Sequence, residues 1–188
     1  MMYKEIIVDA DLCLKLGSSQ KYPYLELLLP LLADTIYIHE VVNGEIKTNR
    51  AQIDSLINSG KVKILSESDL SPHELVLYKA TYAKLGQVML NKNNPNKNRG
   101  EVSTLAMAKT KGIHYFASDE MKVNLQDIID RLLNTGIDDI ACIRIQDIVN
   151  LIKDGKISGM ARKDARLIWI ISNKKKEIFD SKIWPLSG

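Results

Sequence analysis

Residues 5–9 read Glu-Ile-Ile-Val-Asp, a compact apolar run that ends at a carboxylate. Apolar runs of this length, bounded by polar residues, are typical of buried strands in parallel sheets. Similar runs recur at residues 35–38, 62–65, 114–117 and 140–145. Longer helical patterns separate them, as in βαβ units. The sequence therefore predicts an α/β fold with a largely parallel sheet.

Helical patterns fill the stretches between these runs. We expect helices over residues 24–33, 41–46, 52–58, from 72 onward, 101–111, 125–133 and 161–176. Pro30 should kink or divide the first of them, because proline lacks an N–H donor. Ser71, Pro72 and Glu74 form a typical helix start, with a capping serine and a glutamate three residues later. Residues 91–100, rich in asparagine, are predicted to form a loop.

Length and composition exclude several classes of protein. The chain has 188 residues, of which 45% are hydrophobic and 26% charged, so neither a disordered nor a fibrous protein is indicated. No apolar run approaches the roughly 20 residues of a membrane helix, and we expect a cytoplasmic protein without membrane association. We divide the chain into an α/β domain over residues 1–150 and a basic helical extension over residues 151–188. The extension is expected to pack on the core or in an oligomer.

The net charge of +3 is too small to indicate a nucleic-acid-binding protein by itself. Its distribution is uneven, however. Residues 153–182 contain nine Lys and Arg against four Asp and Glu, an excess of five positive charges. The rest of the chain therefore carries two excess negative charges, which agrees with a slightly acidic core and a basic extension.

Four carboxylates occupy places that suggest chemistry. Asp9 ends the first predicted strand and Asp119 follows the fourth, and function gathers at the carboxyl ends of parallel strands. Glu45 lies about one helical turn beyond the second strand, and Glu101 opens a helix after the basic loop. Carboxylates are the ligands that Mg²⁺ and Mn²⁺ prefer. Two carboxylates 4 Å apart repel by about 4 kcal/mol at an effective dielectric near 20, so a cluster favours a bound cation.

Each acid alone also has a structural explanation. A glutamate such as Glu101 is favoured in the first turn of any helix by the helix dipole. Glu45 could be an ordinary exposed helix residue, and Asp119 could cap the turn that follows its strand. The order and strand-end placement of all four together favour a site.

At these residues the sequence resembles the PIN-domain nucleases, which include the toxin ribonucleases of toxin–antitoxin pairs. The resemblance lies in four acidic blocks, at residues 6–14 (IIVDADLCL), 42–46 (VNGEI), 100–106 (GEVSTLA) and 115–120 (YFASDE). It covers about residues 4–150, which would form the PIN-like nuclease domain. It implies a three-layer α/β/α fold with sheet order 3-2-1-4-5, and metal-dependent cleavage of RNA.

The resemblance also assigns roles to residues. It implies that catalysis and binding of one or two Mg²⁺ or Mn²⁺ ions involve Asp9, Glu45, Glu101 and Asp119. Ser118 matches a small hydroxyl residue that commonly precedes the last acid. Asp11 stands where the family often has asparagine, so it is a supporting candidate. The family frequently has a further acid shortly after the fourth block, where this chain has Asn124 and Asp127, and this leaves the number of ions open.

Basic residues and the family resemblance together suggest partners. An RNA substrate is expected, with Lys92, Lys97 and Arg99 beside its phosphates; a solvated surface loop is the plain alternative. An antitoxin protein and a homodimer are further expected partners. The extension carries a basic set that could extend the RNA path, face an acidic partner or be a solvated helix face: Arg162, Lys163, Arg166, Lys174, Lys175 and Lys176. Its apolar stripe of Leu167, Ile168 and Ile171, with Trp169 and Trp184, offers a dimer surface.

Two other functions remain open from the sequence. Asp9 and Asp11 after an apolar strand also resemble the haloacid-dehalogenase phosphatases, in which they would be nucleophile and general acid. That hypothesis leaves Glu45 and Glu101 unexplained. The second alternative is a PIN-like scaffold that binds RNA or a protein without cutting it.

Overall fold

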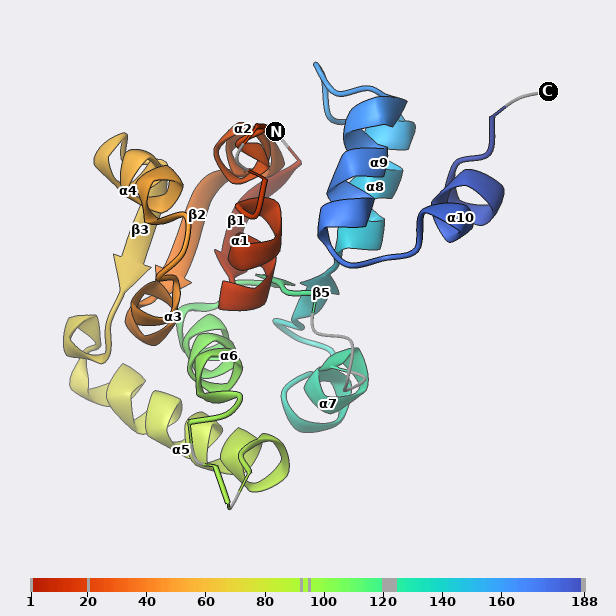
Figure 1. Cartoon of the computed structure of the whole chain (residues 1–188). Coiled ribbons are helices and arrows are strands. Elements are labelled where there is room, and N and C mark those ends of the chain that lie inside the picture. Colours follow the sequence, from red (N-terminus) through yellow and green to blue (C-terminus); the bar gives the residue numbers. More distant parts are fainter. Residues whose placement is uncertain (1, 20, 92, 95, 120–124, 187–188) are drawn as a thin grey trace.

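The computed structural model describes residues 2–19, 21–91, 93–94, 96–119 and 125–186, and its centre is a five-stranded sheet (Figure 1). All neighbouring strands pair in parallel, in the order β3-β2-β1-β4-β5. The strands are β1 (Tyr3–Val8), β2 (Ala33–His39), β3 (Val62–Leu65), β4 (Tyr115–Ala117) and β5 (Ala141–Ile143). This confirms the predicted α/β class and the strand order implied by the resemblance.

Helices cover the sheet on both sides. They are α1 (Ala10–Leu16), α2 (Tyr24–Leu32), α3 (Glu40–Glu45), α4 (Arg50–Asn58), α5 (Pro72–Met89), α6 (Arg99–Lys111), α7 (Leu125–Leu132), α8 (Ile145–Lys153), α9 (Arg162–Ile171) and α10 (Lys176–Ile178). A short 3₁₀ turn over Glu67–Asp69 precedes α5, and a π-helical turn over Phe179–Ile183 follows α10.

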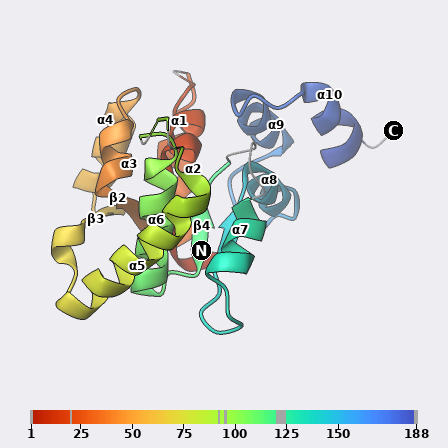
Figure 2. The same cartoon turned by 90° about the horizontal axis from the view of Figure 1, so that it is seen from below.

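Alternating side chains of the strands build two separate apolar layers. Ile6 and Val8 of β1 lie in one cluster with residues of α1, α2, α8 and α9, whereas Ile7 lies in the other with residues of α5, α6 and α7. Successive residues of a strand point to opposite faces of a sheet, so the period of two decides this division. Figure 2 shows α5 and α6 side by side, in contact with each other. The result is the three-layer α/β/α arrangement.

Several predicted elements have different ends in the structure. Helix α2 continues through Pro30 to Leu32 and passes into β2 without a loop. The fifth strand is shorter than predicted, because α8 already begins at Ile145. Helix α6 begins at Arg99, inside the predicted loop. The start of α5 is confirmed, with Ser71 and Glu74 forming a reciprocal capping box.

The prediction of one helix over residues 161–176 is wrong at its C-terminal end. Helix α9 stops at Ile171, where the Ser172 hydroxyl donates to the carbonyl of Ile168. Asn173 then takes a left-handed conformation, with φ of 60°, which a right-handed helix does not allow. The chain turns at this point, and Lys174 and Lys175 leave the helix.

The extension shares its apolar cluster with the core. Ala165, Ile168 and Phe179 are fully buried in the cluster that contains Ile6. Arg162 and Arg166 both bind the carboxylate of Asp180, at 2.7 and 2.8 Å, and so tie α9 to the segment that follows it. Helix α8 crosses the boundary expected at residue 150, and the division into two domains stays a prediction. Among the described residues, no helix is long and apolar enough to cross a membrane.

Candidate active site

Asp9 and Ser118 meet where β1 and β4 end. The two strands are neighbours with Val8 opposite Ala117, so the residues that follow lie side by side. The Asp9 N–H donates to the carbonyl of Ala117 over 3.0 Å, and the Ser118 hydroxyl donates to Asp9 Oδ2 over 3.2 Å. Asp9 is only 1% exposed. The parallel pairing thus produces a buried carboxylate that a hydroxyl orients.

Glu101 places a second carboxylate beside Asp9. It lies in the first turn of α6, a helix that contacts β1 and β4. Burial, and next the negative charge of Glu101, raise the pKa of Asp9 well above its ordinary value; Asp11 adds to this effect. Asp9 Oδ1 is buried and accepts no hydrogen bond from any described atom. The buried Asp9 carboxylate therefore favours a bound proton or a cation.

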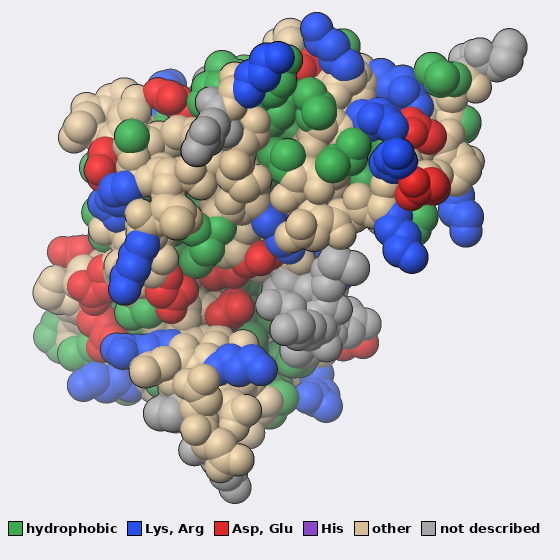
Figure 3. All heavy atoms as spheres, in the orientation of Figure 1, with side chains coloured by type: hydrophobic (Ala, Val, Ile, Leu, Met, Phe, Trp, Pro, Cys, Tyr) green, Lys and Arg blue, Asp and Glu red, His purple; other side chains and the backbone are tan. Residues whose placement is uncertain are grey.

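The Glu45 carboxylate, from α3, lies at the N-terminal end of α6, against Gly100. A Cβ atom on Gly100 would lie 2.6 Å from Glu45 Oε2, so the absent side chain of Gly100 leaves room for this carboxylate. Burial raises the pKa of Glu45, and the Arg99 charge opposes that shift. Figure 3 shows acidic side chains gathered between α3 and α6. Glu45 and Glu101 thus flank the buried Gly100.

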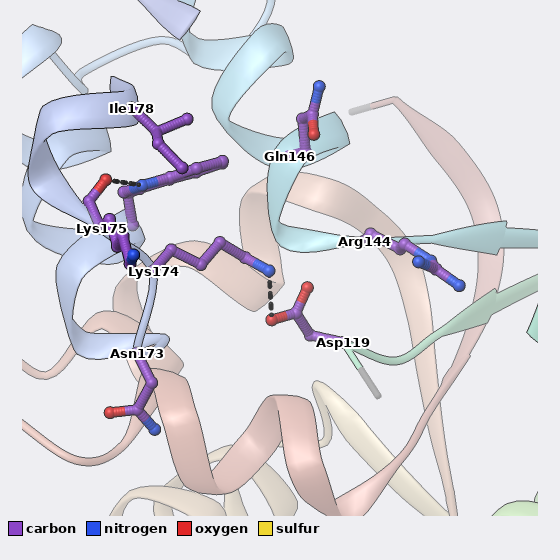
Figure 4. A pocket seen from close by; sticks show the side chains of 8 residues that line it. Asp119, Arg144, Gln146, Asn173, Lys174, Lys175 and Ile178 are labelled. Atoms are coloured by element: carbon purple, nitrogen blue, oxygen red, sulfur yellow. Dashed lines mark hydrogen bonds and ion pairs between the residues drawn. The ribbon is translucent and has the colours of Figure 1, made fainter. Parts of the chain in front are cut away.

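Asp119 is held differently from the other three acids. It is 1% exposed, and its Oδ2 lies 3.1 Å from Lys15 Nζ and 3.1 Å from Lys174 Nζ (Figure 4). The backbone N–H of Ile145 donates to its Oδ1 over 3.3 Å. Lys15 also binds Asp11, at 2.7 Å, so one ammonium connects these two carboxylates. Asp119 is therefore linked to Asp11 through Lys15 and to the C-terminal extension through Lys174.

The donor set fits a hard divalent cation in part. Asp9 and Glu101 offer oxygen ligands, and the unpartnered Oδ1 of buried Asp9 is the kind of atom that a cation would satisfy. Within the described ranges, however, no three His, Cys, Asp or Glu side chains are arranged so that they could hold an ion. Asp119 would have to release a lysine to join such a group. The fit thus rests on Asp9 and Glu101.

The predicted RNA-contacting residues are distributed unequally. Arg99 lines an open cavity of about 500 Å³ beside Glu45, together with Glu40, Glu67 and Asn96. Lys97 is exposed and is not among the residues that line this cavity. Lys92 and Asn124 lie outside the described residues.

Sequence reasoning missed two residues of the site. Lys15 stands four residues after Asp11 in α1, so helical spacing could have indicated their ion pair. Lys174 was predicted to lie in a helix over residues 161–176 as one of a basic set, but it contacts Asp119 from the turn after α9. No spacing in the sequence indicates that contact.

A buried histidine positions the helix that carries Glu45. His39 accepts a hydrogen bond from the Val41 N–H at the start of α3, over 3.1 Å. Its Nε2 lies 3.2 Å from the Tyr78 hydroxyl of α5. Because Nδ1 accepts, the ring is neutral and Nε2 carries the proton. Burial lowers the pKa of His39 to about 4, so the ring stays neutral around pH 7.

Comparisons with known proteins assign no family. No family model matches the sequence, and no curated protein matches it. One solved structure that matches is a chain of VapBC2 from Rickettsia felis, which is bound there to a DNA fragment from its promoter. The match has a TM-score of 0.45 and 17% identity, and it covers 74% of this chain and 98% of that chain. At these values the likeness assigns no function to this chain.

Proposed function

We propose that this chain is a metal-dependent endoribonuclease, with Asp9, Glu45, Glu101 and Asp119 as its acidic residues. The observation that carries the proposal is the pairing of buried Asp9 with Glu101 at the carboxyl ends of β1 and β4. Such a pair disfavours its own double ionisation, and a divalent cation would remove that penalty. The sequence resemblance to the PIN-domain nucleases supports the same activity.

Asp9 and Glu101 would hold Mg²⁺ or Mn²⁺, which when bound supplies Lewis-acid stabilisation of a phosphodiester oxygen and activates a water molecule. Ser118 fixes the orientation of Asp9 through its hydrogen bond. Lys15 keeps Asp11 and Asp119 in place and balances their charge. Glu45 and Arg99 stand at the outer side, where the sugar–phosphate chain of RNA would pass.

The phosphatase hypothesis fits the geometry less well. An acid–base role for Asp11 would have to compete with its ion pair to Lys15, at 2.7 Å. Burial and the nearby charge of Glu101 raise the pKa of Asp9, so the metal-free carboxyl keeps a proton more readily and is a weaker nucleophile. Hydrolysis of a generic aryl phosphate would distinguish the two activities.

The test is cleavage of a labelled single-stranded RNA by the purified chain with Mn²⁺. We expect cleavage by the wild type, none in EDTA, and none by Asp9→Asn. Asp34→Asn is the matched control, because Asp34 is an exposed residue near the start of β2, at the opposite edge of the sheet. Equal cleavage by Asp9→Asn, or cleavage without a divalent ion, contradicts the proposal. If calorimetry detects no Mn²⁺ binding, the non-catalytic scaffold is favoured.

A toxin role is a further step, and it rests on the sequence resemblance. It predicts that expression of the wild type stops growth of the host cell, whereas Asp9→Asn does not. An antitoxin and a homodimer stay predictions of the same kind. If cells that express the active enzyme grow normally, the chain is a ribonuclease but not a toxin.

A further inference from the structure

A second cavity lies on the far side of Asp119, between the strand ends and the C-terminal extension. Its volume is about 470 Å³, within the range of small-ligand pockets. Figure 4 shows it from close by, with Lys174 and Arg144 on either side of Asp119. Its lining comes from the end of β4, the start of α8 and the segment around α9 and α10: Asp119, Arg144, Gln146, Trp169, Asn173, Lys174, Lys175 and Ile178.

Lys174 is held in a defined position in this cavity. Its Nζ lies 3.1 Å from Asp119 Oδ2 and 5.5 Å from the centre of the Trp169 ring. The Trp169 indole N–H donates to the carbonyl of Lys175 over 2.9 Å, which fixes the turn that carries both lysines. A cation held by a carboxylate and an aromatic face loses little freedom when an anion binds.

The lining matches the parts of a nucleotide. Arg144, Lys174 and Lys175 give three positive charges against the single carboxylate of Asp119, so an anion is preferred. Ile178 and the small exposed part of Trp169, which is 5% exposed, add an apolar wall. The side-chain amides of Gln146 and Asn173 can donate and accept hydrogen bonds at a base edge.

Four cations of the extension form two pairs with different surroundings. Arg162 and Arg166 bind Asp180 and stabilise the extension itself. Lys174 and Lys175 line the cavity, which shares Asp119 with the acidic site. A ligand in this cavity would therefore lie next to the carboxylates.

We propose that this cavity binds one nucleotide of a single-stranded RNA beside the cleaved bond, with Lys174 at its phosphate and Arg144 at the adjoining phosphate. The inference rests on the proposed function and names a subsite for its substrate. The C-terminal extension is then part of the RNA-binding surface.

The test is binding of a fluorescein-labelled single-stranded RNA to the full chain in EDTA, followed by fluorescence anisotropy at several salt concentrations. Removal of one cation that binds a phosphate should reduce the slope of log K against log salt concentration by about 0.7. Relative to its affinity in 1 M salt, such a variant should then gain about fivefold less affinity than the wild type when the salt is lowered to about 0.1 M. We expect this change for Lys174→Ala and for Arg144→Ala. Lys163→Ala is the matched control, because it removes an exposed lysine of α9 that does not line the cavity.

A second variant tests the cavity without a change of charge. Gln146→Trp adds bulk at its wall, and we expect weaker RNA binding with an unchanged salt slope. Circular dichroism shows whether each variant is folded. If the folded Gln146→Trp binds as the wild type does, the cavity is not the subsite.

Three further outcomes overturn the inference. The first is that the wild type does not bind RNA. The second is that Lys174→Ala and Lys163→Ala lose equal affinity for RNA. The third is that Lys174→Ala loses affinity for an acidic peptide such as polyglutamate but not for RNA. The last would assign the cavity to a protein partner. Metal-dependent cleavage that persists alongside any of them would leave the proposed function intact, so the two failures are distinguishable.

Discussion

Lys174 Nζ lies 3.1 Å from Asp119 Oδ2, and this contact joins the basic extension to the acidic end of the sheet. The side chains are 12% and 1% exposed, so the pair is largely withdrawn from water. The uneven charge of the chain thereby acquires a spatial meaning: positive charge of the extension lies beside a buried acid of the α/β part.

Asp9→Asn should make the metal-free protein more stable at neutral and higher pH. The native pKa of Asp9 is raised, whereas an unfolded Asp titrates near 4. Between these values the native state keeps the proton and the unfolded state does not, so stability falls as pH rises, by up to about 1.4 kcal/mol per pH unit. An asparagine at position 9 does not titrate, so Asp9→Asn lacks this loss of stability with rising pH.

Urea unfolding in EDTA at several pH values measures the effect. The stability advantage of Asp9→Asn should shrink as the pH falls and level off below about pH 4, where Asp9 is protonated in both states of the wild type. Asp34→Asn, which changes an exposed carboxylate, should follow the wild type. A stability difference independent of pH would mean that the native carboxylate titrates normally.

His39 should make the protein sensitive to acid. Its native pKa is about 4, against about 6.5 when unfolded. Between these values only the unfolded state binds the extra proton, so stability falls as pH drops from 6.5 to 4, by up to about 1.4 kcal/mol per unit. His39→Asn keeps a capping acceptor but no titration, and its unfolding free energy should depend less on pH. The exposed His114→Asn is the control, and equal slopes for the His39 variant and the wild type would refute this account.

Gly100→Ala should reduce cleavage without unfolding the chain. The new Cβ would lie 2.6 Å from Glu45 Oε2 and displace that carboxylate. A shift of about 1 Å in a catalytic group can cost up to about 100-fold, and we expect a tenfold or larger loss in kcat/KM. Gly86→Ala adds the same methyl group in α5, where the only described neighbour within 4 Å is the Leu90 side chain, and should retain activity. Full activity of Gly100→Ala would show that the position of Glu45 is unimportant.

Lys15→Met should destabilise the fold. It removes an ammonium from the buried Asp119 and leaves that charge with less compensation, at a cost on the order of 2–4 kcal/mol. The ion pair of Lys111 with Glu74 is more exposed, at 26% and 34%, so Lys111→Met should destabilise the fold clearly less than Lys15→Met. Comparable losses for the two variants, measured by urea unfolding, would argue against a special role for Lys15.

Strand ends made much of the acidic site predictable. Asp9 and Asp119 each follow an apolar run, and carboxyl ends of parallel strands share one edge of a sheet. The apolar pattern of the strands does not show that β4 lies next to β1, or that Ser118 consequently donates a hydrogen bond to Asp9. Only the family resemblance implied that these two strands are neighbours. The packing of Glu45 against Gly100 depends on the approach of α3 to α6, which no local pattern records.

Lys174 was beyond prediction for a local reason. An uninterrupted helix over 161–176 would have placed Lys174 seven residues after Leu167 and three after Ile171, on the side of the apolar stripe. Ser172 and Asn173 decide otherwise, through a hydroxyl bond back to Ile168 and a left-handed residue. Both residue types also occur inside helices, so only the tertiary packing of α9 shows that the helix ends there.

The pairing of β1 with β4 also has a kinetic consequence. Strands β1, β2 and β3 follow one another closely in the chain and can pair early, whereas Asp9 and Ser118 are 109 residues apart. Because long loops close slowly, we expect β4 and α6 to dock late in folding. The mutually repelling carboxylates would then meet only when the apolar layers are already forming around them, so the early collapse of the chain proceeds without their repulsion.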